Sequence, residues 1–218
     1  MKCIVIIPAS GIGERFDSKI PKQFYKRNGE AIILQTLKKF QSLKEISGII
    51  IATQKKYFKK IDNILNKNKF SKSYKLVKGG KERQDSVYNA LKVCNCKEND
   101  IILVHDAVRP DVSANLVKEL IKNAIKYKAV IPVINISDTI KKIRNKYIEY
   151  TVPRENLKRA QTPQAFEYSL LKNAFENAYK NKIKATDESA LLEFYGFPVK
   201  IIEGEDTNIK ITKKSDIK

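Results

Sequence analysis

CIVIIPASGIGERFDSKIPKQF, residues 3–24, joins an apolar run to a turn of small residues and a group of cations. The run Cys3–Ile7 is short and rich in β-branched residues, which predicts a strand buried on both faces. In the turn Pro8–Gly13, two glycines let the backbone approach a ligand closely. The cations that follow are Arg15, Lys19 and Lys22. A strand, a turn with free N–H groups and nearby cations together indicate a cradle for a polyphosphate.

Two common glycine-rich phosphate loops do not fit this turn. A Walker A loop ends in Gly-Lys-Ser/Thr, which does not occur here. A dinucleotide-binding turn needs a third glycine, where this chain has Phe16, and an acid after the second strand, where it has Ala52 and Thr53. An ordinary strand-to-helix turn with scattered lysines remains an alternative, because a single Gly-x-Gly is a weak signal.

The length and the charge of the chain limit its function further. Its 218 residues suit one sizeable core, so we expect a single domain over residues 1–218. The 43 lysines and arginines outnumber 24 acids and give a formal charge of +19, which invites a nucleic-acid interpretation. The cations are spread along the whole chain, however, and form no arginine-rich tail. We therefore expect small anionic ligands and no nucleic acid, with a basic nucleic-acid-binding module as the alternative from another class.

Cysteine usage and hydropathy predict where the protein resides. Cys3, Cys94 and Cys96 form no C-x-x-C pair, which fits a reducing cytosol. The apolar run near the N-terminus is too short for a signal peptide and ends in a glycine turn. No apolar run approaches the length of a membrane span. These features predict a cytoplasmic protein that does not engage a membrane.

Apolar runs and helical periodicity alternate along the chain as far as residue 134. The predicted strands are 3–7, 48–52, 74–77, 101–104 and 129–134, and the predicted helices are 31–43, 57–65, 81–94 and 115–127. This order predicts an α/β fold, a Rossmann-like three-layer sandwich with a mostly parallel sheet and helices on both faces. Ligands of such folds bind outside the carboxyl ends of the strands. Polar or glycine-rich segments follow three predicted strands, at 8–13, 79–86 and 105–109, so we expect them to share one crevice.

The alternation stops after residue 134. Segments 139–143 and 147–152 flank a short polar turn, which predicts a β-hairpin arm at about residues 137–153. Such an arm has unpaired edges and is often covered by a second subunit, so we expect a homodimer. Further on, the pattern predicts a helix over 169–179 and a second helix that begins at Thr186 as N-cap and ends at Gly196. Late strands are expected at 199–202 and 209–212.

Polar residues after the strand 101–104 are candidates for chemistry. Asp106 is positioned to hold Mg²⁺, a hard cation that binds few protein oxygens together with substrate phosphates; alternatively, it caps the next turn. Arg109 can bind a phosphate or a hydroxyl with its guanidinium fork. His105, the only histidine, is expected to be structural, hydrogen-bonded to backbone. Thr186 serves either as a helix cap or as part of an anion site at a helix N-terminus.

Seven motifs occur in one order along residues 3–217, and in that order they are highly specific. They are PASGIGERF with PKQF, GGKERQDSV, HDAVRP, SDTIK, PRENLKRAQTPQAF, ATDES and EGEDTNIKIT. Together they resemble the 2-C-methyl-D-erythritol 4-phosphate cytidylyltransferase family of non-mevalonate isoprenoid biosynthesis. The alditol-phosphate (ribitol 5-phosphate) cytidylyltransferases share much of the pattern and remain an alternative. The IPASG opening and the AQTPQAF context are closer to the methylerythritol branch.

The resemblance implies a single nucleotidyltransferase domain that, with Mg²⁺, converts CTP and a polyol phosphate into a CDP-alcohol and diphosphate. The nucleophile of that reaction is a phosphate oxygen, already anionic near neutral pH, so no general base is needed. Catalysis must then come from positioning and from stabilisation of charge. This fits a chain with one histidine.

The resemblance also implies roles for individual residues. The cations expected around the α-phosphate are Arg15, Lys22 and Lys210. The residues expected to hold the cytidine are Pro8, Ala9, Ser10, Gly11, Gly80, Lys81 and Ser86. Asp106 and Arg109 are expected at the acceptor polyol with Thr186 beside them, Thr139 and Arg154 are expected from the partner's arm, and Thr162 is expected to order a nearby loop. Lys81 departs from the family pattern, which has an acid there, and this puts cytosine selectivity in doubt if the side chain is used.

Overall fold

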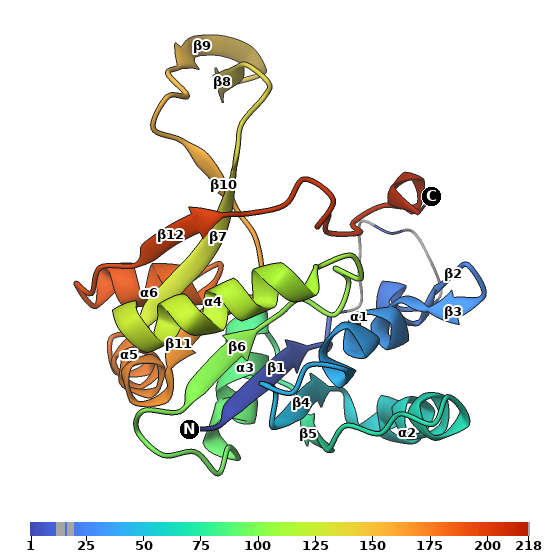
Figure 1. Cartoon of the computed structure of the whole chain (residues 1–218). Helices are drawn as coiled ribbons and strands as arrows, with labels where there is room; N and C mark the ends of the chain where they lie inside the picture. Colours follow the sequence, from blue (N-terminus) through green and yellow to red (C-terminus); the bar gives the residue numbers. More distant parts are fainter. Residues whose placement is uncertain (12–15, 17–19, 218) are drawn as a thin grey trace.

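The computed structural model of the chain describes residues 1–11, 16 and 20–217, and its centre is a twisted sheet (Figure 1). The strands of this sheet are β1 (Cys3–Pro8), β4 (Gly48–Thr53), β5 (Tyr74–Lys78), β6 (Ile101–Val104), β7 (Ala129–Asn135), β10 (Lys158–Ala160), β11 (Gln164–Glu167) and β12 (Lys200–Glu203). Their order is β10-β7-β11-β6-β1-β4-β5, and β12 pairs with β7. Neighbours β6, β1, β4 and β5 are parallel, as is β12 with β7, so the predicted mostly parallel sheet is confirmed.

Helices cover both faces of the sheet. On one face lie α1 (Ile32–Gln41), α2 (Phe58–Lys67) and α4 (Ala114–Tyr127); on the other lie α3 (Arg83–Lys92), α5 (Tyr168–Lys180) and α6 (Glu188–Phe194). Alternate residues of β1 enter the two cores: Val5 packs with the first set of helices and Ile6 with the second. This period of two requires apolar residues at every position of a central strand, which is the pattern of Cys3–Ile7.

Short elements complete the chain. They are the 3-10 helices η2 (Lys22–Phe24), η3 (Lys55–Tyr57) and η4 (Lys214–Asp216) and the two-residue strands β2 (Lys26–Arg27) and β3 (Glu30–Ala31). No helix in the described part of the chain is long and apolar enough to cross a membrane.

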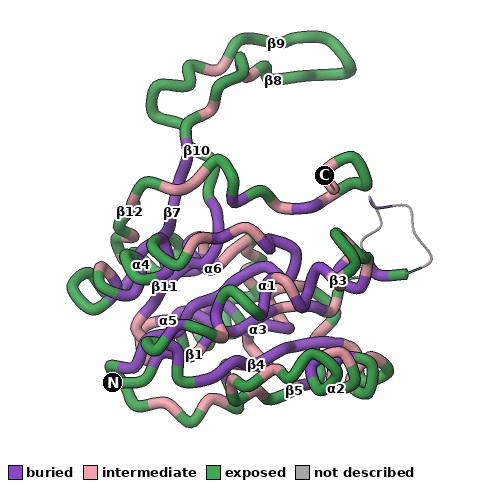
Figure 2. Tube along the Cα trace, turned by 45° about the vertical axis from the view of Figure 1, so that its right-hand side comes forward, coloured by how far each residue is buried: buried purple, intermediate pink, exposed green. Residues whose placement is uncertain are grey.

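The predicted hairpin is present as β8 (Ile140–Arg144) and β9 (Tyr147–Val152). It projects away from the sheet (Figure 1), and its trace is almost wholly exposed (Figure 2). Its two-residue turn has positive φ at Asn145 and Lys146, as a tight hairpin requires. The large exposed side chains of the hairpin are Ile143, Tyr147, Ile148 and Tyr150.

Two sequence predictions are wrong. The strand expected at 209–212 does not form; the Ile211 N–H instead donates to the Val108 carbonyl over 3.0 Å, and the Ile211 side chain is fully buried. Thr186 is not the N-cap of α6, because Asp187 takes that position and accepts from the Ala190 N–H at 3.1 Å. The predicted end of α6 is confirmed at Gly196, which has φ +77°.

Strands β10 and β11 were not predicted. β11 runs antiparallel between β6 and β7, and pairs Gln164 with Val104 and Phe166 with Ala129. It places the fully buried Phe166 in the core beneath α5. The last part of the segment between the hairpin and α5 therefore belongs to the interior of the sheet, whereas β10 lies at the end of the strand order.

Replacing Phe166 with alanine should lower the free energy of unfolding by about 3–5 kcal/mol, since it leaves a cavity in a fully packed core. Urea unfolding measures the change. Phe194→Ala is the matched control: Phe194 is 64% exposed, and its loss should change stability by less than about 0.5 kcal/mol. Equal, small effects of the two substitutions would contradict the central placement of β11.

Candidate active site

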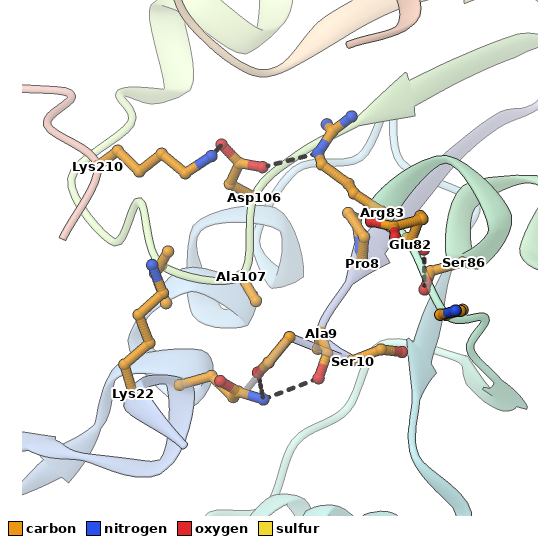
Figure 3. A pocket seen from close by; sticks show the side chains of 14 residues that line it. Pro8, Ala9, Ser10, Lys22, Glu82, Arg83, Ser86, Asp106, Ala107 and Lys210 are labelled. Carbon is orange, nitrogen blue, oxygen red and sulfur yellow. Dashed lines mark hydrogen bonds and ion pairs between the residues drawn. The ribbon is translucent and has the colours of Figure 1, made fainter. Parts of the chain in front are cut away.

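A cavity of about 250 Å³ lies at the carboxyl ends of β1 and β6 (Figure 3). Three of the segments that line it are those that the sequence predicted to meet: the turn after β1, the start of α3 and the loop after β6. The lining residues are Pro8, Ala9, Ser10, Gly11, Lys22, Gln23, Lys81, Glu82, Arg83, Ser86, Asp106, Ala107, Val108 and Lys210. The cavity is thus built from segments that are distant in sequence and are brought together by the parallel strand order.

Glycines allow the start of α3 to pack against the turn after β1. A Cβ on Gly79 would lie 1.7 Å from Ser10 Oγ, and a Cβ on Gly80 would lie 2.0 Å from Asp85 Cβ. The Gly80 N–H donates to Ser86 Oγ at 3.0 Å. The absence of a side chain at Gly79 makes room for Ser10, and its absence at Gly80 makes room for Asp85 in the first turn of α3. The N-terminus of α3, with the positive end of the helix dipole, thus comes to the cavity wall. Such a helix end favours anions.

Side-chain amides hold the turn Pro8–Gly11 in place. Gln23, which is buried, donates through Nε2 to the Ala9 carbonyl at 2.8 Å, and Gln54 donates to the Ser10 carbonyl at 2.9 Å. The Thr53 hydroxyl also donates to the Ala9 carbonyl, at 3.1 Å. These bonds satisfy the Ala9 and Ser10 carbonyls and so fix the backbone of the turn. Sequence reasoning missed Gln23, although it lies in the PKQF motif.

Two of the three predicted catalytic cations line the cavity. Lys22 Nζ donates to the Ile211 carbonyl at 3.2 Å, which ties η2 to the segment that carries Lys210. Lys210 Nζ lies 2.9 Å from Asp106 Oδ2. In Figure 3 both lysine side chains extend to the same side of the cavity. Arg15, the third predicted cation, lies outside the described residues.

Asp106 is buried and ion-paired to three cations. Arg83 Nε donates to its Oδ1 at 3.2 Å, while Lys210 and Arg109 approach its Oδ2 at 2.9 and 3.4 Å. Burial alone would raise the pKa of Asp106, but the charges of Arg83, Lys210 and Arg109 outweigh burial and hold its pKa far below the usual range. The carboxylate is therefore ionised at any ordinary pH and orients the cations around it.

These surroundings do not fit Asp106 as an inner ligand of Mg²⁺. Both of its oxygens already face cations, so a metal ion would have to displace Lys210 or Arg109 from Oδ2. Among the described residues, no three histidine, cysteine or acidic side chains form a cluster that could hold a metal ion without substrate oxygens. A role of Asp106 as a metal ligand remains a prediction, and the ion pairs on both of its oxygens disfavour it.

His105 and Thr162 support Asp106 from behind. His105 Nε2 lies 3.0 Å from the Arg109 carbonyl and must donate to it, so Nδ1 accepts from the Thr162 hydroxyl at 3.1 Å. The same hydroxyl accepts from the Asp106 N–H at 3.1 Å. Burial lowers the pKa of His105 to about 4, so the ring is neutral. These contacts agree with the structural role expected for His105 and with a loop-ordering role for Thr162.

Arg109 is buried and does not line the cavity. Its Nη1 donates to the Asn208 carbonyl at 2.7 Å, and Asn208 in turn donates through Nδ2 to the Thr162 carbonyl at 2.8 Å. Arg109 therefore joins the loop after β6 to the segment before Lys210. Its predicted contact with an acceptor remains untested.

The other predicted acceptor residues lie apart from this cavity. Thr139 and Arg154 are at the base of the hairpin, where Arg154 donates to the Ser137 carbonyl. Thr186 precedes the N-cap of α6. Conversely, sequence reasoning assigned no role to Arg83 or to Glu188, whose Oε1 lies 2.7 Å from Arg83 Nη1. Both residues stand within quoted motifs, GGKERQDSV and ATDES, but their contact spans 105 positions.

An α/β sandwich with a glycine-rich turn, a helix N-terminus and two lysines around one cavity defines a site for a phosphorylated, nucleotide-like ligand. Residues 3–218 match the model of the 2-C-methyl-D-erythritol 4-phosphate cytidylyltransferase family. The chain belongs to this family and is a nucleotidyltransferase.

Relatives and solved structures agree with this membership. A protein of Clostridioides difficile named 2-C-methyl-D-erythritol 4-phosphate cytidylyltransferase is 43% identical over 98% of this chain and 90% of its own. The crystal structure of the enzyme of that name from Francisella tularensis superposes with a TM-score of 0.86 at 36% identity, covering 100% of this chain and 97% of the other. The 4-diphosphocytidyl-2C-methyl-D-erythritol synthase of Anaerococcus prevotii superposes equally well, at 33% identity over 99% and 92% of the two chains.

Acid should destabilise the fold because His105 is buried in its neutral form. Burial lowers the pKa of His105 from its ordinary value of 6.5 to about 4 in the folded protein, so the unfolded chain binds the proton more readily. The stability that His105 contributes is present above about pH 6.5 and is lost as the pH falls toward 4, by about 2 kcal/mol at about pH 5.

Urea unfolding at about pH 7.5 and about pH 5 measures this loss. His105→Asn, which cannot take up a proton, is the matched variant and should show a smaller difference between the two pH values. An equal pH dependence in both proteins would mean that another group is responsible.

Proposed function

We propose that the chain transfers CMP from CTP to 2-C-methyl-D-erythritol 4-phosphate, giving 4-diphosphocytidyl-2-C-methyl-D-erythritol and diphosphate, in non-mevalonate isoprenoid precursor biosynthesis. The observation that carries the proposal is the cavity in which the turn Pro8–Gly11, the start of α3 and the lysines Lys22 and Lys210 meet. Family membership supplies the identity of the two substrates.

The reaction needs charge stabilisation more than proton transfer. A phosphate oxygen of the acceptor attacks the α-phosphorus of CTP and diphosphate leaves. This oxygen is already anionic, and His105 is neutral with both ring nitrogens engaged, so it takes no proton in this scheme. In the proposed mechanism Lys22, Lys210 and Arg15 stabilise the negative charge that develops on the pentavalent phosphorus.

The small residues of the cavity suit a nucleoside. The side chains beside β1 are small and leave room for a nucleoside; they are Pro8, Ala9, Ser10 and Gly11. On the other side, the backbone at the start of α3 comes close to the cavity at Gly80 and Ser86. Lys81 is exposed at the cavity rim, where its backbone can bind the base whatever its side chain does. We assign these residues to the cytidine.

The acceptor is assigned to the Asp106 side of the cavity. A carboxylate oxygen has more than one lone pair, so Asp106 can accept from a polyol hydroxyl while it keeps its cations. Arg109 then acts mainly by orienting Asp106. Thr162 is proposed to act from behind Asp106, whose N–H it binds. Thr186 lies outside the cavity lining and is proposed to contribute at the start of α6, and Thr139 and Arg154 are proposed to come from a second copy of the chain.

Mg²⁺ is proposed to accompany CTP. A hard cation of this kind keeps several waters and binds substrate phosphates, and it would supply further neutralisation of the triphosphate. The ion-paired state of Asp106 leaves the phosphate oxygens as the better donors. We also place the protein in the cytoplasm, in keeping with the free thiols of Cys3, Cys94 and Cys96.

A homodimer with exchanged arms is proposed because the hairpin exposes apolar side chains. Ile143, Tyr147, Ile148 and Tyr150 are between 48% and 79% exposed. Large apolar side chains exposed on one projecting element are typical of an interface. A two-fold axis would bury the same patch on both chains.

The test of the proposed function is an assay of the purified protein with CTP and each of two acceptors. We expect CDP-alcohol formation with 2-C-methyl-D-erythritol 4-phosphate and little with ribitol 5-phosphate. The reverse preference would favour the alditol-phosphate alternative. Inactivity with both, together with salt-sensitive binding of DNA or RNA, would favour the nucleic-acid alternative.

Lys22→Ala should lower kcat on the order of 10²-fold, because one donor to the transition state is lost. The affinity for CTP should change less. Lys122→Ala is the control, since Lys122 is on α4 with a side chain that is 79% exposed, and it should leave kcat unchanged. A normal kcat with a raised KM in Lys22→Ala would make Lys22 a ground-state binder.

Subunit mixing tests the exchanged arm. Inactive Lys22→Ala and inactive Arg154→Ala chains are combined under conditions in which subunits exchange. If Arg154 serves the neighbour's site, each mixed dimer has one intact site, and activity should return to about a quarter of wild type. No recovery after verified exchange would place Arg154 in the site of its own chain.

A further inference from the structure

Arg83 is held between two carboxylates. Its Nε donates to Asp106 Oδ1 at 3.2 Å, and its Nη1 donates to Glu188 Oε1 at 2.7 Å. Arg83 stands in the first turn of α3 and lines the cavity, whereas Glu188 begins α6. In Figure 3 the guanidinium reaches over Asp106 from the side opposite Lys210. The shorter of the two contacts is the one with Glu188.

Glu188 is buried at a cost that Arg83 offsets. Its side chain is 1% exposed, and burial raises its pKa against the opposing charge of Arg83. Within the described part of the chain, its second oxygen, Oε2, is buried and has no hydrogen-bond partner. A buried carboxylate is unfavourable unless it is paired. The contact with Arg83 is therefore the interaction that stabilises Glu188 in this place.

The start of α6 is rigidly attached to the strand pair that carries Asp106. Gln164 of β11 donates to Asp187 Oδ2 at 2.8 Å and accepts from the Ser189 N–H at 3.1 Å. Gln164 pairs with Val104, two residues before Asp106. Glu188 lies between Asp187 and Ser189, so these two bonds fix its backbone relative to β6. It can serve as an anchor for a long, otherwise mobile arginine side chain.

This anchor determines which edge of Arg83 meets Asp106. With Nη1 on Glu188, Arg83 presents Nε to Oδ1, and Oδ2 is left to Lys210 and Arg109. A guanidinium without that anchor could turn its fork to Asp106 and bind both oxygens. It would then compete with Lys210 for Oδ2. The position of the Lys210 ammonium group at the cavity follows from this arrangement.

We infer that Glu188 is a positioning residue for the transfer reaction, acting through Arg83 on Asp106 and Lys210. The inference rests on the proposed function, because Lys210 is taken as a donor to the reacting phosphate. It assigns to Glu188 an effect on turnover in addition to its contribution to the packing of α6. An ion pair that only joined α3 to α6 would affect stability alone.

Glu188→Ala and Glu188→Gln distinguish these roles, with Ser189→Ala as the control. Ser189 is buried in the same helical turn and its hydroxyl donates to Asp187 Oδ1 at 3.1 Å, so its loss perturbs α6 without touching Arg83. We expect kcat to fall on the order of tenfold or more in Glu188→Ala, since small displacements of a catalytic group are costly. Glu188→Gln, which keeps an acceptor oxygen, should recover part of the loss. KM for CTP should stay within about threefold of wild type, and Ser189→Ala should keep its kcat.

A double-variant cycle with Arg83→Gln tests the route of the effect. If Glu188 acts through Arg83, Glu188→Gln should cost less than about twofold in kcat once Arg83 has been replaced. Arg83→Gln alone leaves Glu188 buried and unpaired, so urea unfolding of each variant establishes that it is folded in the assay. If Arg83→Gln is unstable, Arg83→Lys takes its place in the cycle, because it leaves a cation beside Glu188 but cannot bridge the two carboxylates with separate guanidinium nitrogens.

Three results would overturn the inference. If the wild type is active and Glu188→Ala keeps the wild-type kcat, Glu188 has no positioning role, and the proposed function is unaffected. If Glu188→Gln lowers kcat by the same factor in the wild type and in the Arg83-substituted protein, Glu188 does not act through Arg83. A wild type inactive with both acceptors would overturn the proposed function, and the inference with it.

Discussion

The ion pairing of Asp106 is the interaction on which the site depends. One buried carboxylate at the end of β6 faces Arg83, Lys210 and Arg109, which come from α3, from the segment before η4 and from its own loop. A buried charge is tolerated only with such partners. Three segments that are distant in sequence thus meet at one point, and the excess of positive charge there suits the proposed binding of a polyphosphate.

The backbone around Asp106 is fixed by a second set of contacts. The Thr162 hydroxyl joins the Asp106 N–H to the neutral His105 ring, and Asn208 links the Thr162 carbonyl to Arg109. Every member is buried, so each bond is shielded from water. The carboxylate is therefore preorganised before any ligand arrives, as catalysis by charge stabilisation requires.

Local patterns predicted the half of the fold in which pairing follows sequence order. The apolar run of β1, the glycines at 79–80 and the alternation up to residue 134 gave the parallel strands and the crevice at their carboxyl ends. β11 was missed because it enters between β6 and β7 in the opposite direction, which no local period encodes. The segment 209–212 has the β-branched pattern of a strand, but it forms no strand because Ile211 is buried against Val108 of the loop after β6. Thr186 and Asp187 are both good caps, and the sequence alone does not choose between them.

The site was predictable to the same extent as the fold. The segments that carry Ser10, Ser86 and Asp106 were predicted to meet because parallel strand ends share an edge, while the roles of Ser10 and Ser86 came from the family resemblance. Arg83 and Glu188 were missed because only the tertiary structure brings them into contact. The turnover number of Asp106→Asn tests the central claim most directly, since this change keeps the shape and removes the charge. A fall in kcat on the order of 10²-fold in a folded variant is the predicted result, and a kcat equal to wild type would contradict the account.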